Sequence, residues 1–181
     1  TAPGVPDSYQ GDELWNFALV DPDNRRPVDY GERRALMDSA RALSPVGDIT
    51  SNSFKLFVLR SALHARAQHP ELFAAGAYQP LPPRGHHAPH LFAFLRYPPT
   101  AASITVVPRL IHRLAPDRLP TANDWADATL RLPSSLSPTT THWRNALTGA
   151  ELSLVSRHAL AIPDVLATLP FALLIAREPA R

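Results

Sequence analysis

The chain has 181 residues, 45% of them hydrophobic, and a formal net charge of +2, so we expect one domain of ordinary size or a small domain with an appended segment. The small net charge gives no electrostatic case for binding nucleic acid or a membrane surface. The absence of cysteine excludes disulfides and thiolate metal sites. Since no apolar run is long enough to span a membrane and no signal peptide is recognised, we expect a cytoplasmic protein.

One stretch combines polar, charged and aromatic residues without regular periodicity, and it lies within the first thirty residues. Residues 5–10 predict a short strand, although Pro3 and Pro6 limit the ladder bonds that its start can make. Gly11 then opens a long loop that runs to Asp29 and is rich in Asp, Asn and Arg. Carboxylates and guanidinium groups bind hydroxyl pairs, and aromatic rings stack on sugars, so the loop suits a polyhydroxyl ligand. Solvated turns with local side-chain hydrogen bonds are the alternative interpretation.

A first helix is predicted over residues 30–43. Asp29 can cap its start, and Glu32 stands three residues on as the reciprocal partner of a capping box. The helix is expected to end before Pro45, because the residue before a proline avoids the helical region. Its buried stripe is expected to consist of Leu36, Met37, Ala40 and Leu43.

A second helix is predicted over residues 52–68, with Ser51 or Ser53 as its cap. A single helical turn then begins at Pro70 and closes at Gly76. The apolar face of the longer helix is expected to consist of Phe54, Phe57, Val58, Ala62 and Ala65, widened by Leu59 and Leu63.

After Gly76 the pattern changes to short apolar runs that are separated by proline, glycine and other turn residues. Eight such runs are predicted to be strands: 77–81, 90–96, 103–109, 128–132, 141–145, 151–154, 158–161 and 172–177. Their spacing of roughly ten residues favours a small antiparallel sandwich.

Two other groups of side chains admit a binding interpretation. His86, His87 and His90 invite a metal site, but they lie where a hairpin loop enters a strand, and a solvated loop is the better interpretation. Trp125 and Trp143 invite sugar stacking, as in a carbohydrate-binding module, whereas packing in the core is the simpler interpretation. We therefore predict no metal and no cofactor.

Several motifs along the chain resemble one family. Residues 3–15 read Pro-Gly-Val-Pro-Asp-Ser-Tyr-Gln-Gly-Asp-Glu-Leu-Trp, and residues 19–30 read Leu-Val-Asp-Pro-Asp-Asn-Arg-Arg-Pro-Val-Asp-Tyr. The first motif is typical of the α-amylase superfamily, and the second is similar to the C-terminal part of the maltooligosyl trehalose synthases. His-Pro-Glu-Leu-Phe at 69–73, Val-Pro-Arg at 107–109 and the Trp143 to Gly149 segment extend the resemblance over nearly the whole chain.

The resemblance implies a fold in two parts. Residues 1–76 would hold the last strand, an active-site loop and the closing helices of a (β/α)8 barrel, in which the loops after the strands build the active site. Residues 77–181 would form an all-β antiparallel sandwich C-terminal domain. The expected fold class is thus an α+β fragment of a larger enzyme. Because the chain opens at Thr1 and its only methionine is Met37, we expect the natural start to lie elsewhere, and we expect residues 1–30 to be irregular without the rest of the barrel.

The resemblance also implies a reaction. Enzymes of this family convert the reducing-end α-1,4 bond of a maltooligosaccharide into an α,α-1,1 bond by intramolecular transglucosylation, a retaining double displacement. The catalytic carboxylates of the superfamily lie on earlier barrel strands, so no residue of this chain inherits a catalytic role. The chain alone is expected to be inactive, with the maltooligosaccharide and the missing N-terminal part of the enzyme as its partners.

The substrate-binding role implied for this chain falls on the loop. The predicted sugar-binding residues are Tyr9, Gln10, Glu13, Asp21, Asn24, Arg25, Arg26 and Asp29. Arg26 or Asp29 could instead serve only to hold the loop. Two alternatives stay open: a stand-alone carbohydrate-binding or interaction module, and another α-amylase superfamily hydrolase or glucan transferase.

Overall fold

The computed structural model describes residues 1–18, 25–42, 48–97, 101–134, 136, 142–156 and 158–176. Three helices follow the first irregular segment: α1 (Tyr30–Ala42), α2 (Asn52–Gln68) and α3 (Pro70–Ala74). Short helices interrupt the β part that comes next: η2 (Ala88–His90), α4 (Ile111–Leu114), η3 (Ala122–Trp125) and α5 (Ile162–Val165). No helix in the described part of the chain is long and apolar enough to cross a bilayer.

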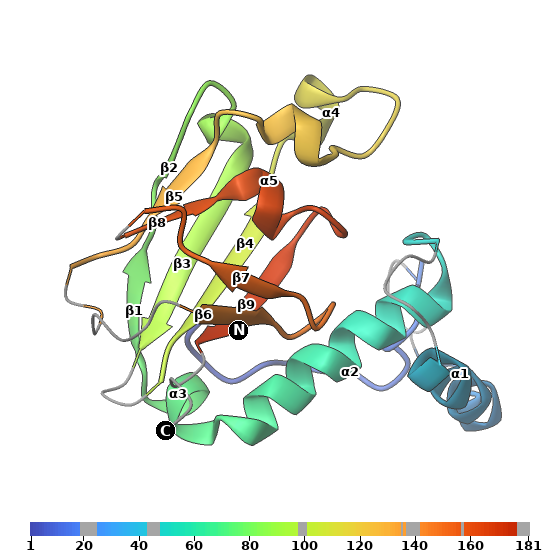
Figure 1. Cartoon of the computed structure of the whole chain (residues 1–181). Coiled ribbons are helices and arrows are strands. Elements are labelled where there is room, and N and C mark those ends of the chain that lie inside the picture. Colours follow the sequence, from blue (N-terminus) through green and yellow to red (C-terminus); the bar gives the residue numbers. More distant parts are fainter. Residues whose placement is uncertain are drawn as a thin grey trace.

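In the part of the chain that the structure describes, nine strands form two antiparallel sheets. They are β1 (Ala77–Pro80), β2 (Pro83–Arg84), β3 (Leu91–Tyr97), β4 (Ser103–Pro108), β5 (Thr129–Arg131), β6 (His142–Asn145), β7 (Glu151–Ser153), β8 (Ala159–Ala161) and β9 (Ala172–Ala176). The larger sheet has the order β1-β3-β4-β9-β6-β7, and the smaller one has the order β2-β5-β8. Figure 1 shows both sheets on one side of the molecule, with α2 crossing from α3 to α1. The predicted all-β antiparallel part is confirmed.

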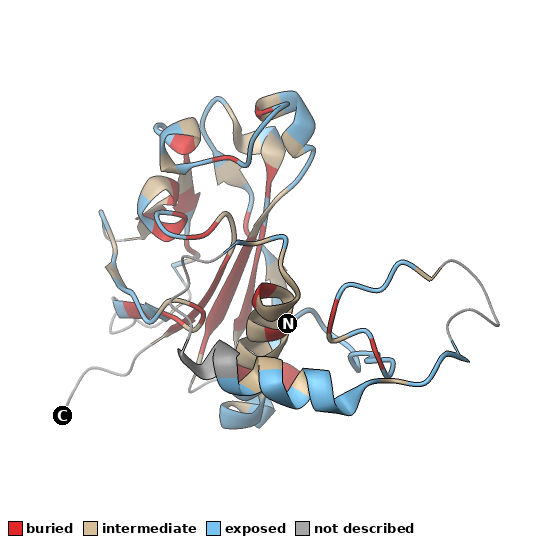
Figure 2. Cartoon of the chain, turned by 90° about the vertical axis from the view of Figure 1, so that its right-hand side faces the viewer, coloured by how far each residue is buried: buried red, intermediate tan, exposed pale blue. Residues whose placement is uncertain are grey.

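The six-stranded sheet is covered on both faces. Successive side chains of a strand point to opposite faces, so one strand can contribute to two cores. In β9, Leu174 packs into a core that is shared with the three-stranded sheet. Its neighbours Leu173 and Ile175 pack into a second core with α2 and α3, together with Phe54 and Phe73. The helical segment is therefore attached to the β part through one face of the larger sheet. Figure 2 shows strands of this sheet coloured as buried.

The helix boundaries follow from their caps. The Ser51 hydroxyl accepts a hydrogen bond from the Phe54 N–H at 3.2 Å and so begins α2. The Asp29 carboxylate accepts one from the Glu32 N–H at 2.9 Å and so begins α1. Both caps agree with the sequence-based prediction, since these side chains satisfy backbone N–H groups that have no partner within the helix. Gly76 follows the end of α3, where a Cβ would clash with the Leu72 carbonyl oxygen.

Three sequence-based expectations are wrong in this structure. Residues 5–9 form no strand and are exposed, because no neighbouring strand offers them a ladder of hydrogen bonds. Leu36 and Met37 of α1 are half-buried rather than buried, since α1 packs mainly on α2 at the edge of the molecule. The predicted stripe members Ala40 and Leu43 lie outside the described side chains.

The third correction concerns the apolar face of α2, whereas the interpretation preferred for two tryptophans is confirmed. Trp125 and Trp143 have no exposed surface, so they pack in the core as expected, and the alternative in which they stack on a sugar is wrong. On α2, Phe57 is half-buried and Leu63 is exposed, whereas Leu56, which was not placed on the apolar face, is buried.

Arg96 is a buried charge that joins α3 to the larger sheet. Its side chain is 1% exposed and donates to the carbonyl oxygens of Gly76 at 2.9 Å, Phe73 at 3.2 Å and Thr1 at 3.2 Å. No carboxylate pairs with it in the part of the chain that the structure describes. The guanidinium thus satisfies carbonyl groups at the C-terminal end of α3, where a positive charge also suits the helix dipole.

Replacing Arg96 tests this attachment. Arg96→Ala should lower the free energy of unfolding by about 2–4 kcal/mol, because it leaves buried carbonyl groups without donors. The measurement is urea denaturation of the 181-residue chain. Arg131→Ala, at an exposed position of β5, is the matched control and should change stability by less than about 0.5 kcal/mol. Equal midpoints for the two variants would contradict the assigned role.

Candidate functional site

The two ends of the Gly11–Asp29 loop meet at Arg33 of α1. Its Nε donates to Glu13 Oε2 at 3.1 Å, its Nη2 to the Gly11 carbonyl at 2.9 Å, and its Nη1 to the Asp29 carbonyl at 3.0 Å. Glu13 Oε2 also accepts from the Gly11 N–H at 3.0 Å. We call Gly11, Glu13, Asp29 and Arg33 the clasp. Gly11 has φ +102°, a conformation that favours glycine.

The clasp carries a charged pair at the edge of solvent. The side chains of Arg33 and Glu13 are 16% and 33% exposed. Burial alone would raise the pKa of the Glu13 carboxyl. Hydrogen bonds from the backbone N–H groups of Glu13 and Gly11 and from Arg33 outweigh burial, so the pKa is lowered from its ordinary value of 4.5. Glu13 is therefore held as a carboxylate.

A polar hollow of about 450 Å³ opens beside the clasp. Among its lining residues are Gln10, Trp15, Asn16, Arg26 and Asp29. The hollow thus combines amides, carboxylates and guanidinium groups with two aromatic rings, those of Trp15 and Phe17. Such a set can bind several hydroxyl groups by charge-assisted hydrogen bonds while a ring supports an apolar face.

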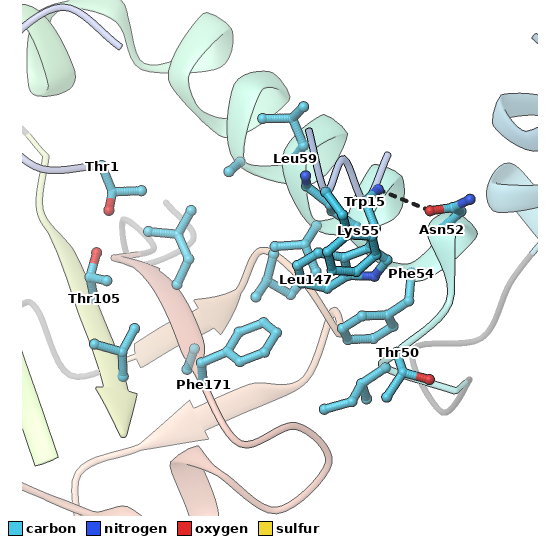
Figure 3. Close-up of a pocket in the computed structure, with 17 residues that line it drawn as sticks. Thr1, Trp15, Thr50, Asn52, Phe54, Lys55, Leu59, Thr105, Leu147 and Phe171 are labelled. Atoms are coloured by element: carbon cyan, nitrogen blue, oxygen red, sulfur yellow. Dashed lines mark hydrogen bonds between the residues drawn. The ribbon is translucent and has the colours of Figure 1, made fainter. Parts of the chain in front are cut away.

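Trp15 is one of the two aromatic residues that line this hollow, and contacts with α2 hold it in place. The backbone N–H of Trp15 donates to Asn52 Oδ1 at 2.9 Å. Lys55 Nζ lies 5.0 Å from the centroid of the Trp15 ring and donates to the Leu14 carbonyl at 2.7 Å, and a cation over an aromatic face is attractive. Nearly half of the Trp15 surface remains exposed. Figure 3 shows Asn52 and Lys55 holding the Trp15 segment against α2.

The structure brings together some of the predicted sugar-binding residues. Gln10, Arg26 and Asp29 line the polar hollow, although the Asp29 carboxylate also caps α1. Tyr9 and Arg25 are exposed and lie outside the hollow's lining. The predicted residues Asp21 and Asn24 lie outside the described residues.

Glu13 and Arg33 show what reasoning from the sequence alone does not reveal. Glu13, predicted at the pocket wall, is bound to Arg33 and to the Gly11 N–H. Arg33 was not predicted to belong to the site. Its position four residues after the Asp29 cap offered a signal, because side chains in the first turn of a helix lie near the loop that enters it.

A second, larger cavity lies on the other side of Trp15. This apolar groove has a volume of about 1050 Å³ and is lined by Phe54 and Leu59 of α2, Phe171, Leu173 and Trp15, among others. Figure 3 shows Trp15, Phe54 and Phe171 between α2 and the larger sheet. Its walls are mostly apolar, so it offers few partners for the hydroxyl groups of a sugar. Within the described part of the chain, no group of three or more His, Asp or Glu is placed to hold a metal ion.

Comparison of the fold indicates a class of protein. The structure resembles that of an α-amylase from Anoxybacillus with a TM-score of 0.50 and 12% sequence identity, over 89% of this chain and 26% of that chain. At this identity the likeness concerns the fold alone. It shows that the helices and antiparallel sheets of this chain are arranged as in a part of that structure.

Comparison of the sequence is more specific. The chain is 40% identical to a protein called "Putative maltooligosyl trehalose synthase" in two strains of Mycobacterium tuberculosis, over 97% of this chain and 19% of the relative. The structure of a mutant of maltooligosyltrehalose synthase from Arthrobacter ramosus matches with a TM-score of 0.75 and 37% identity, over 97% of this chain and 20% of that chain. No family model matches the chain. The resemblance noted from the sequence is confirmed: the chain corresponds to the C-terminal part of the maltooligosyl trehalose synthases and spans about a fifth of the length of these relatives.

The clasp predicts a dependence of stability on pH. Because the pKa of Glu13 is lower in the folded chain than its ordinary value of 4.5, its carboxylate stabilises the fold above that pH. This contribution is lost as the pH falls through the folded-state pKa. The difference in free energy of unfolding between the chain and Glu13→Gln should therefore be largest near neutrality and vanish on acidification. Asp117→Asn, at an exposed position between α4 and η3, is the control, and an identical pH profile for both variants would count against the charged clasp.

Proposed function

We propose that this chain forms the C-terminal part of an enzyme that converts the reducing-end α-1,4 bond of a maltooligosaccharide into an α,α-1,1 bond. The observation that carries the proposal is the 40% identity with a protein called maltooligosyl trehalose synthase over 97% of the chain. Because the chain spans 19% of that relative, the reaction belongs to the longer protein. This chain is expected to be inactive by itself.

The proposed reaction divides the work between two parts of the enzyme. A carboxylate nucleophile forms a covalent glycosyl-enzyme and an acid/base carboxyl serves both steps, as in retaining glycosidases. The first step breaks the α-1,4 bond and releases glucose. In the second step the anomeric hydroxyl of that glucose attacks the glycosyl-enzyme in place of water and gives its proton to the acid/base carboxylate. The bond to the nucleophile breaks, and a new α,α-1,1 bond forms. We assign both carboxylates to parts of the enzyme outside this chain.

This chain would contribute the site that holds the released glucose. The polar hollow supports this role, because Gln10, Arg26 and Asp29 line it beside the exposed face of Trp15. A glucose held there with fixed orientation reacts as an intramolecular partner, which favours isomerisation over hydrolysis by free water. Tyr9, Glu13, Asp21, Asn24 and Arg25 complete the proposed binding set.

The proposed division of the chain into two parts follows from the similarity to the maltooligosyl trehalose synthases. Residues 1–76 would close a (β/α)8 barrel, with the irregular segment at 5–10 pairing as its last strand when the other strands are present. Residues 77–181 would be the C-terminal β-sandwich domain. Gly76, which ends α3 immediately before β1, supports a boundary at this point. The segment 1–18 already lies along α2, from Gly4 near Arg66 to Trp15 near Asn52.

The reaction itself can be tested with maltopentaose. The longer enzyme that contains this chain should convert it to a product of unchanged mass that no longer has a reducing end. The 181-residue chain alone should leave maltopentaose unchanged. Mass spectrometry together with a reducing-end assay measures both outcomes. Turnover by the chain alone would overturn the proposal that its catalytic carboxylates lie elsewhere.

Substitutions in the hollow test the binding role. In the longer enzyme, Arg26→Ala should raise the ratio of free glucose to trehalosyl product by about tenfold, because a poorly held glucose loses the advantage of proximity. Asp29→Asn should raise the same ratio without loss of stability, since asparagine caps a helix as well as aspartate does.

Arg34→Ala provides the matched control for both substitutions. Arg34 is exposed on α1 and lies outside the lining of the hollow, so the product ratio should not change. If Arg26→Ala and Asp29→Asn both keep the product ratio and the KM of the parent enzyme, the hollow is not the glucose site.

A further inference from the structure

The clasp joins two segments that are far apart in the sequence. Arg33 reaches the Gly11 carbonyl across 22 positions and Glu13 across 20 positions, and the same guanidinium holds the Asp29 carbonyl. Gly11 directly follows Gln10, and Asp29 lies three residues after Arg26. The distance between these hollow-lining side chains is therefore controlled by the contacts that Arg33 makes.

The chemistry of the clasp suits a fixed geometry. A guanidinium is a rigid planar fork of N–H donors, and here three of its nitrogens each bind a different acceptor. Lysine carries the same positive charge on a compact ammonium group. It could keep the attraction to Glu13, but it could not span all three acceptors. Arg33 is largely buried, with 16% of its side chain exposed, which limits competition from water for these bonds.

We infer that Arg33, acting through Glu13 and the two carbonyl groups, is a positioning residue that sets the product of the reaction. The clasp holds both edges of the polar hollow at the separation at which a released glucose stays oriented toward the new bond. When the clasp opens, the edges separate and water replaces glucose as the attacking group. This inference rests on the proposed function. Arg33 itself lines the hollow, and the role assigned to it acts through the contacts that its guanidinium makes with Glu13 and the two carbonyl groups.

A purely structural role for Arg33 is the competing explanation, and it makes a different prediction. If Arg33 only stabilised α1, its loss would lower the amount of folded enzyme and reduce both products in proportion. A positioning role changes the ratio of the products in the enzyme that remains folded. The product ratio therefore separates the two roles, whereas total activity does not.

The experiment compares Arg33→Ala, Arg33→Lys and Arg34→Ala in the longer enzyme with maltopentaose as substrate. Arg33→Ala should raise the ratio of free glucose to trehalosyl product by about tenfold to 100-fold, as expected when a reacting group is displaced by about an ångström. Arg33→Lys should give an intermediate ratio, and it keeps the test decisive if Arg33→Ala does not fold. Arg34→Ala, one position further on the exposed surface of α1, should match the parent enzyme.

Arg26→Ala in the same series separates failure of this inference from failure of the proposed function. If Arg26→Ala raises the ratio but neither Arg33 variant does, Arg33 has no positioning role and the glucose site stands. If no variant changes the ratio, both the site and the clasp are wrong. If Arg33→Lys and Arg33→Ala reduce both products in proportion, Arg33 is structural only.

Discussion

The register of strand β9 is the constraint on which the rest of the structure depends. Leu174 enters the core between the two sheets, while Leu173 and Ile175 enter the core beneath α2 and α3. A slip of one residue against β4 or β6 would exchange these side chains between the two faces and spoil both cores at once. Since α2 in turn carries the segment with Trp15, the position of the polar hollow follows from the pairing of a strand that contributes no residue to it.

Local signals predicted most of the fold. The caps at Asp29 and Ser51 could be predicted, because a capping side chain acts within three residues of its own position. The eight predicted strands were readable because turn residues bound each of them. The two-residue strand β2 and the short helices α4 and α5 carry too few residues for a periodic pattern. The strand predicted at 5–10 did not form, since strand formation needs a partner that propensity cannot supply.

The candidate site was predictable as a stretch of sequence but not as a set of roles. The density of Asp, Asn and Arg singled out the loop, and the structure then gathered Gln10, Arg26 and Asp29 around one hollow. The sequence did not show that Glu13 is bound within the clasp, nor that Arg33 holds it. Both facts depend on contacts across about twenty positions. The local pattern places Arg33 near the end of the loop but does not show that it reaches Glu13 and Gly11. Burial likewise showed that Trp125 and Trp143 belong to the core. A tryptophan in the sequence alone suits either a core or a surface on which a sugar stacks.

Helix α2 has a mechanical consequence for the whole chain. Its 17 residues make a rigid rod of about 25 Å, with Asn52 and Lys55 supporting Trp15 at one end and Ala65 buried against the β part at the other. Repacking near Ala65 tilts this rod, and a small tilt at one end becomes a displacement at the other. The β part holds none of the proposed sugar-binding residues. Its packing against α2 nevertheless sets the position of the hollow.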